Sequence, residues 1–151
     1  MALKPGDKAP AISLTDQHGK TRKLSEFKGR KVLVYFYPKA DTPGCTKQAC
    51  GLNDVLGDIG DTAVLGISPD PSKKLKKFQD KCDIGFPLLG DVDHSVCEAY
   101  DVWKEKSMYG KTYMGVERSA FLVGPDGKLR NVWYKVSPKD TPLNLLAALA
   151  S

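Results

Sequence analysis

The sequence predicts an α/β fold of three layers, in which helices flank a mixed central sheet and a β-hairpin precedes it. Three observations support this prediction. Continuous apolar runs at 31–37 and 62–68 are typical of strands buried on both faces. A helical pattern follows each run, which gives the order strand, helix, strand, helix. A Pro-Asp-Gly turn at 125–127 separates two further strand-like runs, so an antiparallel pair closes the sheet.

The first elements are a hairpin and a short turn. Strand-like runs at 11–14 and 21–24 flank a polar segment with a glycine, which favours a hairpin that serves packing. A capped turn at 25–29 then leads into the strand at 31–37. Pro38 ends this strand because proline donates no hydrogen bond to a neighbouring strand.

The helix after this strand is expected over 43–56, with Thr42 as N-cap and Pro43 in its first turn. At 100° per residue, Cys45 falls within one apolar stripe of the helix. Cys50 falls on the opposite face. The two thiols are therefore expected to point apart on one helix.

The rest of the chain continues the alternation. A helix is expected to run to Lys81 or Cys82, because apolar residues recur there at intervals of three and four. A short helix follows near 96–100, and the stretch 103–115 shows no sustained period, which predicts a loop. The last elements are strands at 117–123 and 129–134 and a helix at 143–150. No repeat or linker is visible, so one domain is assigned to residues 1–151.

Composition narrows the class of protein. A chain of 151 residues with 41% apolar content can bury roughly two-thirds of its unfolded surface without a metal or disulfide. The net charge is +5, but its lysines lie among acidic neighbours, which argues against a nucleic-acid partner. No apolar run resembles a signal peptide or approaches the ~20 residues of a membrane span, so we expect a cytoplasmic protein with reduced cysteines.

Cys45 is the candidate reactive residue. A cysteine in the first turn of a helix lies where unpaired backbone N–H groups favour the thiolate, the nucleophilic form. No lysine or arginine flanks it in the preceding turn, so a cation is needed from elsewhere, and Arg118 on the strand at 117–123 is the candidate. The alternative is that Cys45 is an unreactive, buried small side chain.

Cys50 favours redox chemistry, because a sulfenic acid condenses with a nearby thiol. On an intact helix, a separation of five residues means a rise of ~7.5 Å, already beyond the ~7 Å limit on Cα separation for a disulfide. The helix must therefore unwind locally, and Gly51 and Gly57 each weaken it by about 1 kcal/mol relative to alanine. We expect a switch between a wound and an unwound state.

These residues amount to a family resemblance. Pro38, Thr42 and Cys45 match the Pro-x-x-x-Thr-x-x-Cys signature of peroxiredoxins, and with Cys50 the chain resembles the bacterioferritin comigratory protein, or Q-type, branch. The resemblance continues through 65–68, 86–88, 109–112 and 118–119. It implies a thioredoxin-like fold and thiol-dependent reduction of hydrogen peroxide and organic hydroperoxides, without a metal or organic cofactor.

The resemblance also implies roles for residues around the reactive thiol. Cys45 becomes the peroxidatic cysteine, which attacks the O–O bond as thiolate. Thr42 binds the peroxide through its hydroxyl, and Pro38 shields the thiolate from water. Arg118 keeps the thiolate ionised and stabilises charge on the leaving oxygen. Backbone N–H groups of Gly44 and Cys45 complete the substrate pocket.

The second half of the cycle follows from the same resemblance. Cys50 becomes the resolving cysteine, which attacks the sulfenic acid and leaves an intramolecular disulfide for thioredoxin or glutaredoxin to reduce. The expected state is a monomer or a weak dimer. Some members of the branch resolve from the following helix, but their position matches Gln79 here, so Cys50 is favoured over Cys82.

Four further residues complete the candidate set. Gln48 and Ala120 depart from the common family pattern, glutamate and threonine respectively, and lie where they can tune the hydrogen bonding of Arg118. Cys97 fits the inner face of a short helix and is assigned to packing. His94 precedes it, but no Cys-x-x-Cys pair is present, so no metal site is expected.

Two other functions remain open at this stage. A disulfide reductase of the thioredoxin type requires two thiols two residues apart at the helix start, whereas four residues separate them here. A binding or holdase module is suggested by the basic charge and the apolar C-terminal helix. Peroxide consumption that depends on Cys45 separates these possibilities.

Overall fold

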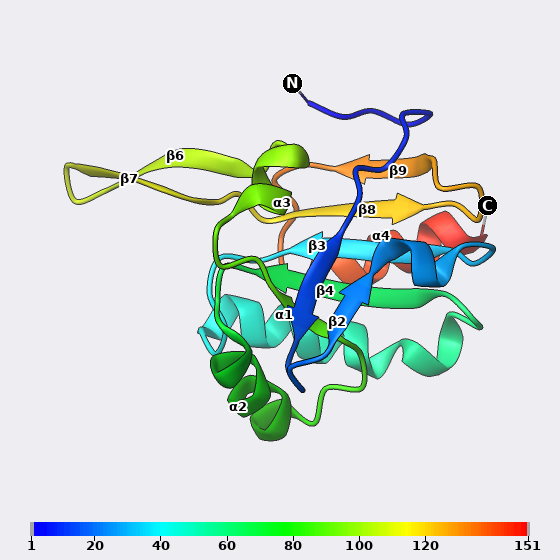
Figure 1. Cartoon of the computed structure of the whole chain (residues 1–151), viewed down its shortest axis with the longest axis horizontal. Helices are drawn as coiled ribbons and strands as arrows, with labels where there is room; N and C mark the ends of the chain where they lie inside the picture. The colour runs from blue at the N-terminus through cyan, green and yellow to red at the C-terminus, as the bar shows by residue number, and fades with distance from the viewer. Residues whose placement is uncertain (1, 151) are drawn as a thin grey trace.

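The computed structural model describes residues 2–150, in which a mixed sheet forms the middle layer (Figure 1). The inner strands β3, β4 and β5 are parallel, and β8, β9, β1 and β2 pair antiparallel at the two sides. The expected mixed sheet is therefore confirmed. The strand order is β2 (Thr21–Lys23), β1 (Ser13–Asp16), β5 (Leu88–Gly90), β4 (Ala63–Ser68), β3 (Val32–Phe36), β8 (Ser119–Val123) and β9 (Leu129–Trp133).

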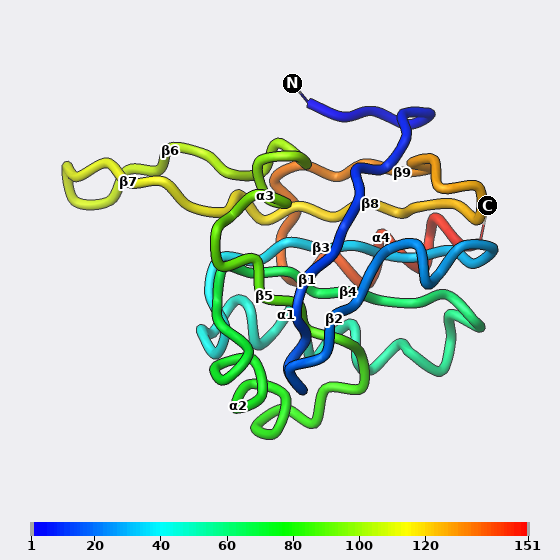
Figure 2. Tube along the Cα trace, viewed as in Figure 1, coloured from blue at the N-terminus to red at the C-terminus, as the bar shows by residue number. Residues whose placement is uncertain are grey.

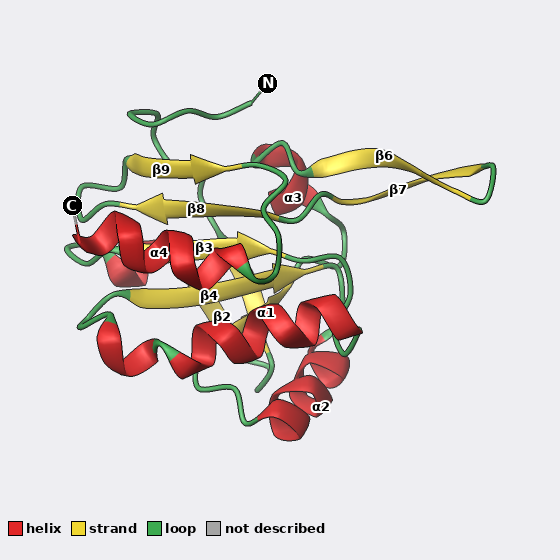
Figure 3. Ribbon diagram, turned by 180° about the vertical axis from the view of Figure 1, so that it is seen from behind, coloured by secondary structure: helices red, strands yellow, loops and turns green. Residues whose placement is uncertain are grey.

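Helices cover both faces of this sheet. The helices α1 (Pro43–Asp54), α2 (Ser72–Cys82) and α4 (Asp140–Ala150) lie on the face seen in front in Figure 3, and α3 (Ser95–Ala99) lies on the other. Alternate side chains of β3 pack into two separate hydrophobic cores, because successive side chains point to opposite faces of a strand. Leu33 and Tyr35 pack with α1, whereas Val34 and Phe36 pack with Cys97 of α3.

Strand β3 and helix α1, on either side of the loop at Pro38, begin and end within about two residues of their predicted bounds. All five residues of β3 are buried, as expected for a strand covered on both faces. Helix α1 begins at Pro43 as expected and ends at Asp54, and a short 3₁₀ turn at Leu56–Asp58 continues it. The opening hairpin, β4, α2 and the terminal helix are also present near their predicted positions.

The stretch 103–115 was predicted as a loop, and this prediction was wrong. It forms a two-stranded arm, β6 (Trp103–Met108) and β7 (Lys111–Val116), that projects from the sheet (Figure 1). Tyr109 and Gly110 make its two-residue turn, both with positive φ. Most of the arm is exposed on both sides, so neither face requires the alternation of apolar and polar residues that identifies a strand.

The N-terminal segment lies beside the edge strand β9, as the chain trace in Figure 2 shows. The N–H of Gly6 donates to the carbonyl of Leu129, and the N–H of Ala9 donates to that of Gly127. In the part of the chain that the structure describes, no helix has the length and apolar character needed to cross a membrane.

Candidate active site

Cys45 lies in the first turn of α1, and the residue is only 1% exposed. Its Sγ is 3.4 Å from Nη2 of Arg118, which donates to it. Helix α1 therefore brings its amino-terminal N–H groups to the same thiol that the guanidinium contacts. A thiolate at this position is stabilised from both sides.

The sheet explains how a residue 73 positions away reaches this thiol. Strands β3 and β8 are antiparallel, and Phe36 at the end of β3 pairs with Ser119 at the start of β8. Arg118 immediately precedes β8 rather than lying on it, which corrects the sequence assignment. Its carbonyl accepts from the N–H of Val136 at 2.9 Å, which fixes the backbone beside the carboxyl end of β3.

Gln48, a residue of α1, binds the same guanidinium through its side-chain amide. Its Oε1 accepts from Nη1 of Arg118 at 2.7 Å, and its Nε2 donates to Oγ1 of Thr141 at 2.8 Å. Gln48 is fully buried. The Thr141 hydroxyl donates to the carbonyl of Ser137, so each polar atom of the Gln48 amide has a partner and the chain of bonds runs from Arg118 to α4.

Thr42 and Gly44 lie where the sequence motif predicts, with one difference. Thr42 is the N-cap residue of α1, but its hydroxyl makes no capping bond and donates to the carbonyl of Lys39 at 2.8 Å. The lone pairs of Oγ1 are consequently left to accept a hydrogen bond from another molecule. A Cβ on Gly44 would lie 3.2 Å from Nη2 of Arg118, so the guanidinium packs directly against this glycine.

The loop that carries Pro38 is anchored to the neighbouring strand. The N–H of Ala40 donates to Oδ2 of Asp70 at 2.7 Å, and the Ser68 hydroxyl donates to the same oxygen at 2.8 Å. Asp70 and Ser68 are buried. Pro38 itself is half-buried between β3 and this anchor.

Sequence reasoning missed Lys106, which lies on the arm strand β6. Burial lowers the pKa of its ammonium below the ordinary value, and the positive charge of Arg118 lowers it further, whereas Cys45 and Glu117 act in the opposite direction. Lys106 is therefore a second cation within electrostatic range of Arg118 and Cys45. Only the hairpin geometry of 103–116 could have revealed it.

Two buried tyrosines lie in the core around the thiol, Tyr35 on β3 and Tyr37 one residue beyond the end of that strand. Tyr35 and Tyr37 stack with ring centroids 5.5 Å apart and belong to the same core as Cys45. Burial raises the pKa of both hydroxyls well above the ordinary value, and Cys45 contributes to the rise. Both rings therefore stay neutral beside the thiol.

The other cysteines lie apart from the Cys45 thiol. Cys50 faces away from Cys45 as predicted, but it is half-buried and faces α2, where Cys82 is its neighbour. Cys97 is fully buried in the core on the other face. Burial, and then the adjacent Asp91 carboxylate, raises its pKa, which makes it an inert thiol.

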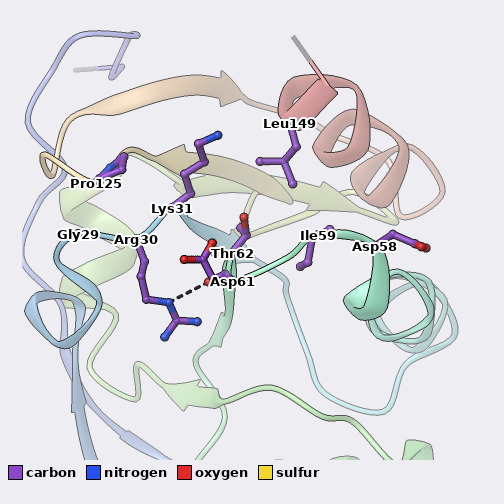
Figure 4. A pocket seen from close by; sticks show the side chains of 9 residues that line it. All are labelled: Gly29, Arg30, Lys31, Asp58, Ile59, Asp61, Thr62, Pro125 and Leu149. Atoms are coloured by element: carbon purple, nitrogen blue, oxygen red, sulfur yellow. Dashed lines mark hydrogen bonds between the residues drawn. The ribbon is translucent and has the colours of Figure 1, made fainter.

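A surface hollow lies at the opposite end of the sheet. Lys31 and Thr62, which precede β3 and β4, line it together with Leu149 of α4 (Figure 4). Arg30 donates from Nε to the carbonyl of Asp61 at its edge, at 2.8 Å. None of the residues that line this hollow belongs to the Cys45 site.

Comparison with known proteins shows the family to which the chain belongs. The family model described as the AhpC/TSA family matches residues 5–132. Peroxiredoxin Bcp of Escherichia coli (strain K12) is 53% identical over 133 residues, which cover 87% of this chain and 85% of that protein.

Solved structures of the same type share the fold. The bacterioferritin comigratory protein of Xanthomonas campestris, studied for its alkyl peroxide reduction activity in trapped intermediate and ligand complexes, has a TM-score of 0.89 and 37% identity, covering 97% of this chain and 98% of that one. A cysteine-to-serine variant of PrxQ from Xylella fastidiosa has a TM-score of 0.93 and 31% identity, covering 99% and 97%. The thioredoxin-like fold expected from the sequence is thereby confirmed. The chain belongs to the AhpC/TSA family, and within it to the Bcp and PrxQ peroxiredoxins.

Proposed function

We propose that this protein is a thiol-dependent peroxidase in which Cys45 is the peroxidatic cysteine. The observation that carries the proposal is the 3.4 Å contact between Cys45 Sγ and Arg118 Nη2 at the start of α1. The thiolate attacks one peroxide oxygen, the O–O bond breaks, and the second oxygen leaves with a proton as water or an alcohol. The sulfur becomes a sulfenic acid.

Arg118 acts on the oxygen that acquires negative charge in this step. A guanidinium already held in position stabilises such charge without reorganisation. The Gln48 bond supplies the positioning, since it engages Nη1 and leaves Nη2 directed at the sulfur. Removal of an oriented donor of this kind costs about 10²–10³ in rate, which sets the expected effect of replacing Arg118.

Thr42, Pro38 and the first N–H groups of α1 form the rest of the proposed substrate pocket. Because the Thr42 hydroxyl donates to Lys39, its oxygen can accept the proton of a hydroperoxide. The backbone N–H groups of Gly44 and Cys45 face the same region and can donate to the peroxide oxygens. Pro38 limits the access of water to the thiolate.

Cys50 is the proposed resolving cysteine. Its thiolate attacks the sulfenic sulfur, the S–O bond breaks, and the oxygen leaves as water, which yields a Cys45–Cys50 disulfide. This bond requires the first turns of α1 to unwind. A thiol reductant of the thioredoxin or glutaredoxin type then reduces this disulfide. The protein is proposed to act as a monomer in the cytoplasm, where such reductants keep thiols reduced.

The test is peroxide consumption coupled to thioredoxin and its reductase. Cys45→Ser should consume none, and Arg118→Met should lower the rate of Cys45 oxidation by about 10²–10³ in stopped-flow measurements. Cys97→Ser, far from the site, serves as the control and should retain the wild-type rate. Persistent consumption by Cys45→Ser would refute the proposal.

The role of Cys50 needs its own variant. Cys50→Ser should accumulate sulfenic acid on Cys45 and lose turnover with thioredoxin. Full turnover by this variant would transfer the resolving role to Cys82. The binding-module alternative has little support, because Leu145 and Leu146 of the apolar helix α4 pack against the core.

A further inference from the structure

Cys50 and Cys82 are neighbours across the interface between α1 and α2. The two helices pack against each other on the same face of the sheet (Figure 3). Asn53, one turn after Cys50, donates to the carbonyl of Asp83 at 3.0 Å and accepts from the N–H of Gly85 at 2.8 Å. The residue that follows Cys82 is therefore fixed to the turn of α1 that follows Cys50.

A second contact, a solvent-exposed ion pair, lies on the other side of Cys82. Lys81 pairs with Asp41 at 2.9 Å, so the residue before Cys82 is joined to the loop that precedes α1. Burial raises the pKa of Cys82, and the adjacent Cys50 thiol raises it further, as does Asp41, while Lys81 lowers it. The Asn53 bonds and the Lys81–Asp41 pair thus place Cys82 against the side of α1 that carries Cys50.

We infer that Cys82 is a third redox cysteine, which accepts the disulfide from the Cys45–Cys50 pair and forms a Cys50–Cys82 bond. The inference rests on the proposed function, which supplies the first disulfide. In the step, the Cys82 thiolate attacks Cys50 Sγ, the Cys45–Cys50 bond breaks, and Cys45 leaves as a thiolate. The Cys82 proton goes to solvent, and no external oxidant or reductant is consumed.

Helix geometry gives this exchange a direction. A Cys45–Cys50 bond cannot form on a wound helix, because the rise of ~7.5 Å exceeds the Cα separation that a disulfide allows. The bonds of Asn53 hold the end of α2, and with it Cys82, beside Cys50 while α1 is wound. The exchange therefore lets the first turns of α1 re-form, and it returns the leaving thiolate to Arg118 Nη2.

The exchange also has a functional consequence. Cys45 becomes free while the protein still carries one disulfide, so it can react with a second equivalent of peroxide before any reductant arrives. The stored disulfide lies between two helices at a half-buried position instead of at the bottom of the peroxide site. A reductant would then meet the disulfide away from the substrate pocket.

The experiment oxidises the reduced full-length protein with one equivalent of hydrogen peroxide, blocks free thiols at successive times, and maps disulfides by peptide mass spectrometry. The Cys45–Cys50 peptide should appear first and then be replaced by Cys50–Cys82, with Cys45 alkylated. In Cys82→Ser the first disulfide should last at least about tenfold longer. Cys97→Ser is the matched control and should exchange like the wild type.

The pH dependence gives a second readout. Attack requires the Cys82 thiolate, and its pKa is raised, so the exchange should accelerate as the pH rises toward and beyond the ordinary thiol range. The groups around this thiol are Cys50, Asp41 and Lys81, and Lys81→Gln should slow the exchange at a given pH by removing the cation that favours the thiolate.

The outcomes separate the two proposals. A Cys45–Cys50 disulfide that persists while Cys82 stays alkylated overturns the exchange and leaves the peroxidase proposal intact. A direct Cys45–Cys82 disulfide also overturns it, because Cys82 would then resolve the sulfenic acid itself. Absence of any peroxide reaction at Cys45 would instead refute the peroxidase proposal.

Discussion

Gln48 Oε1 accepts a hydrogen bond from Arg118 Nη1 at 2.7 Å, so an uncharged, fully buried amide orients the guanidinium that contacts Cys45. The amide is itself held by Thr141 of α4. The position of the cation thus depends on α1, on the start of β8 and on the last helix together. Glutamine supplies an acceptor for the guanidinium here without adding a charge.

Replacing Gln48 with leucine should slow the oxidation of Cys45 by about tenfold, because a hydrogen bond to a charged group contributes about 1.5–3 kcal/mol and only part of it acts on the transition state. Gln48→Glu keeps an acceptor for Nη1 and should restore most of the rate. Stopped-flow oxidation with hydrogen peroxide measures both variants. If Gln48→Leu and the wild-type protein oxidise at equal rates, Gln48 does not position Arg118.

Gly44→Ala should lower activity while it raises helix stability. The new methyl would lie 3.2 Å from Arg118 Nη2, which forces the guanidinium to shift by a few tenths of an ångström. Misplacement on this scale should cost about tenfold in rate, since a 1 Å error costs about 10². Alanine in place of glycine inside a helix contributes up to about 1 kcal/mol of stability, measurable by urea unfolding.

Gly57→Ala is the matched control for that substitution. Nothing lies within 4 Å of a Cβ at Gly57, so this variant should leave the oxidation rate unchanged. A Gly44→Ala protein that reacts as fast as Gly57→Ala would mean that the guanidinium has room to move without loss of function.

The fold around the site could be predicted because its signals are local. Buried strands give continuous apolar runs, and Thr42 and Pro43 define the start of α1. The arm of β6 and β7 has no buried face along most of its length, so it leaves no alternation in the sequence. The electrostatic influence of Lys106 on Arg118 and Cys45 depends on that arm and could not be inferred.

The two thiols of the helix interface illustrate the same limit. The helical angle correctly predicted that Cys50 points away from Cys45. The angle within one helix does not, however, show which element packs against the face that carries Cys50. The packing of α2 and the bonds of Asn53 decide that Cys50 faces Cys82. Arg118 could be assigned from the family motif, although its place before β8 required the register with β3.

Lys106→Gln should lower the rate of Cys45 oxidation by about threefold at low ionic strength, because a second cation within range of the thiolate is lost. The effect should shrink toward 1 M salt, where the Debye length falls to about 3 Å. Lys104→Gln removes the same charge from the same strand, but Lys104 pairs with Asp101 at 2.9 Å. A rate loss of equal size in both variants would indicate a general effect of net charge.

The last prediction concerns the wound and unwound states of α1. If Cys45 and Cys50 are joined, residues 43–52 should lose protection against amide exchange by at least tenfold, which corresponds to about 1.4 kcal/mol of local stability. The Cys82→Ser variant should be used for this measurement, because it prevents passage of the disulfide to the α1–α2 interface. Protection in β3 and β4 should stay unchanged and serves as the internal reference.

The oxidised wild-type protein provides the decisive comparison for this helix. Once the disulfide has passed to Cys50 and Cys82, the first turns of α1 are free to rewind, so protection at 43–52 should return toward the reduced level. Oxidised Cys82→Ser should remain unprotected at the same residues. Equal protection in reduced and oxidised Cys82→Ser would contradict the unwinding, because a Cys45–Cys50 bond and a wound first turn cannot coexist at a rise of ~7.5 Å.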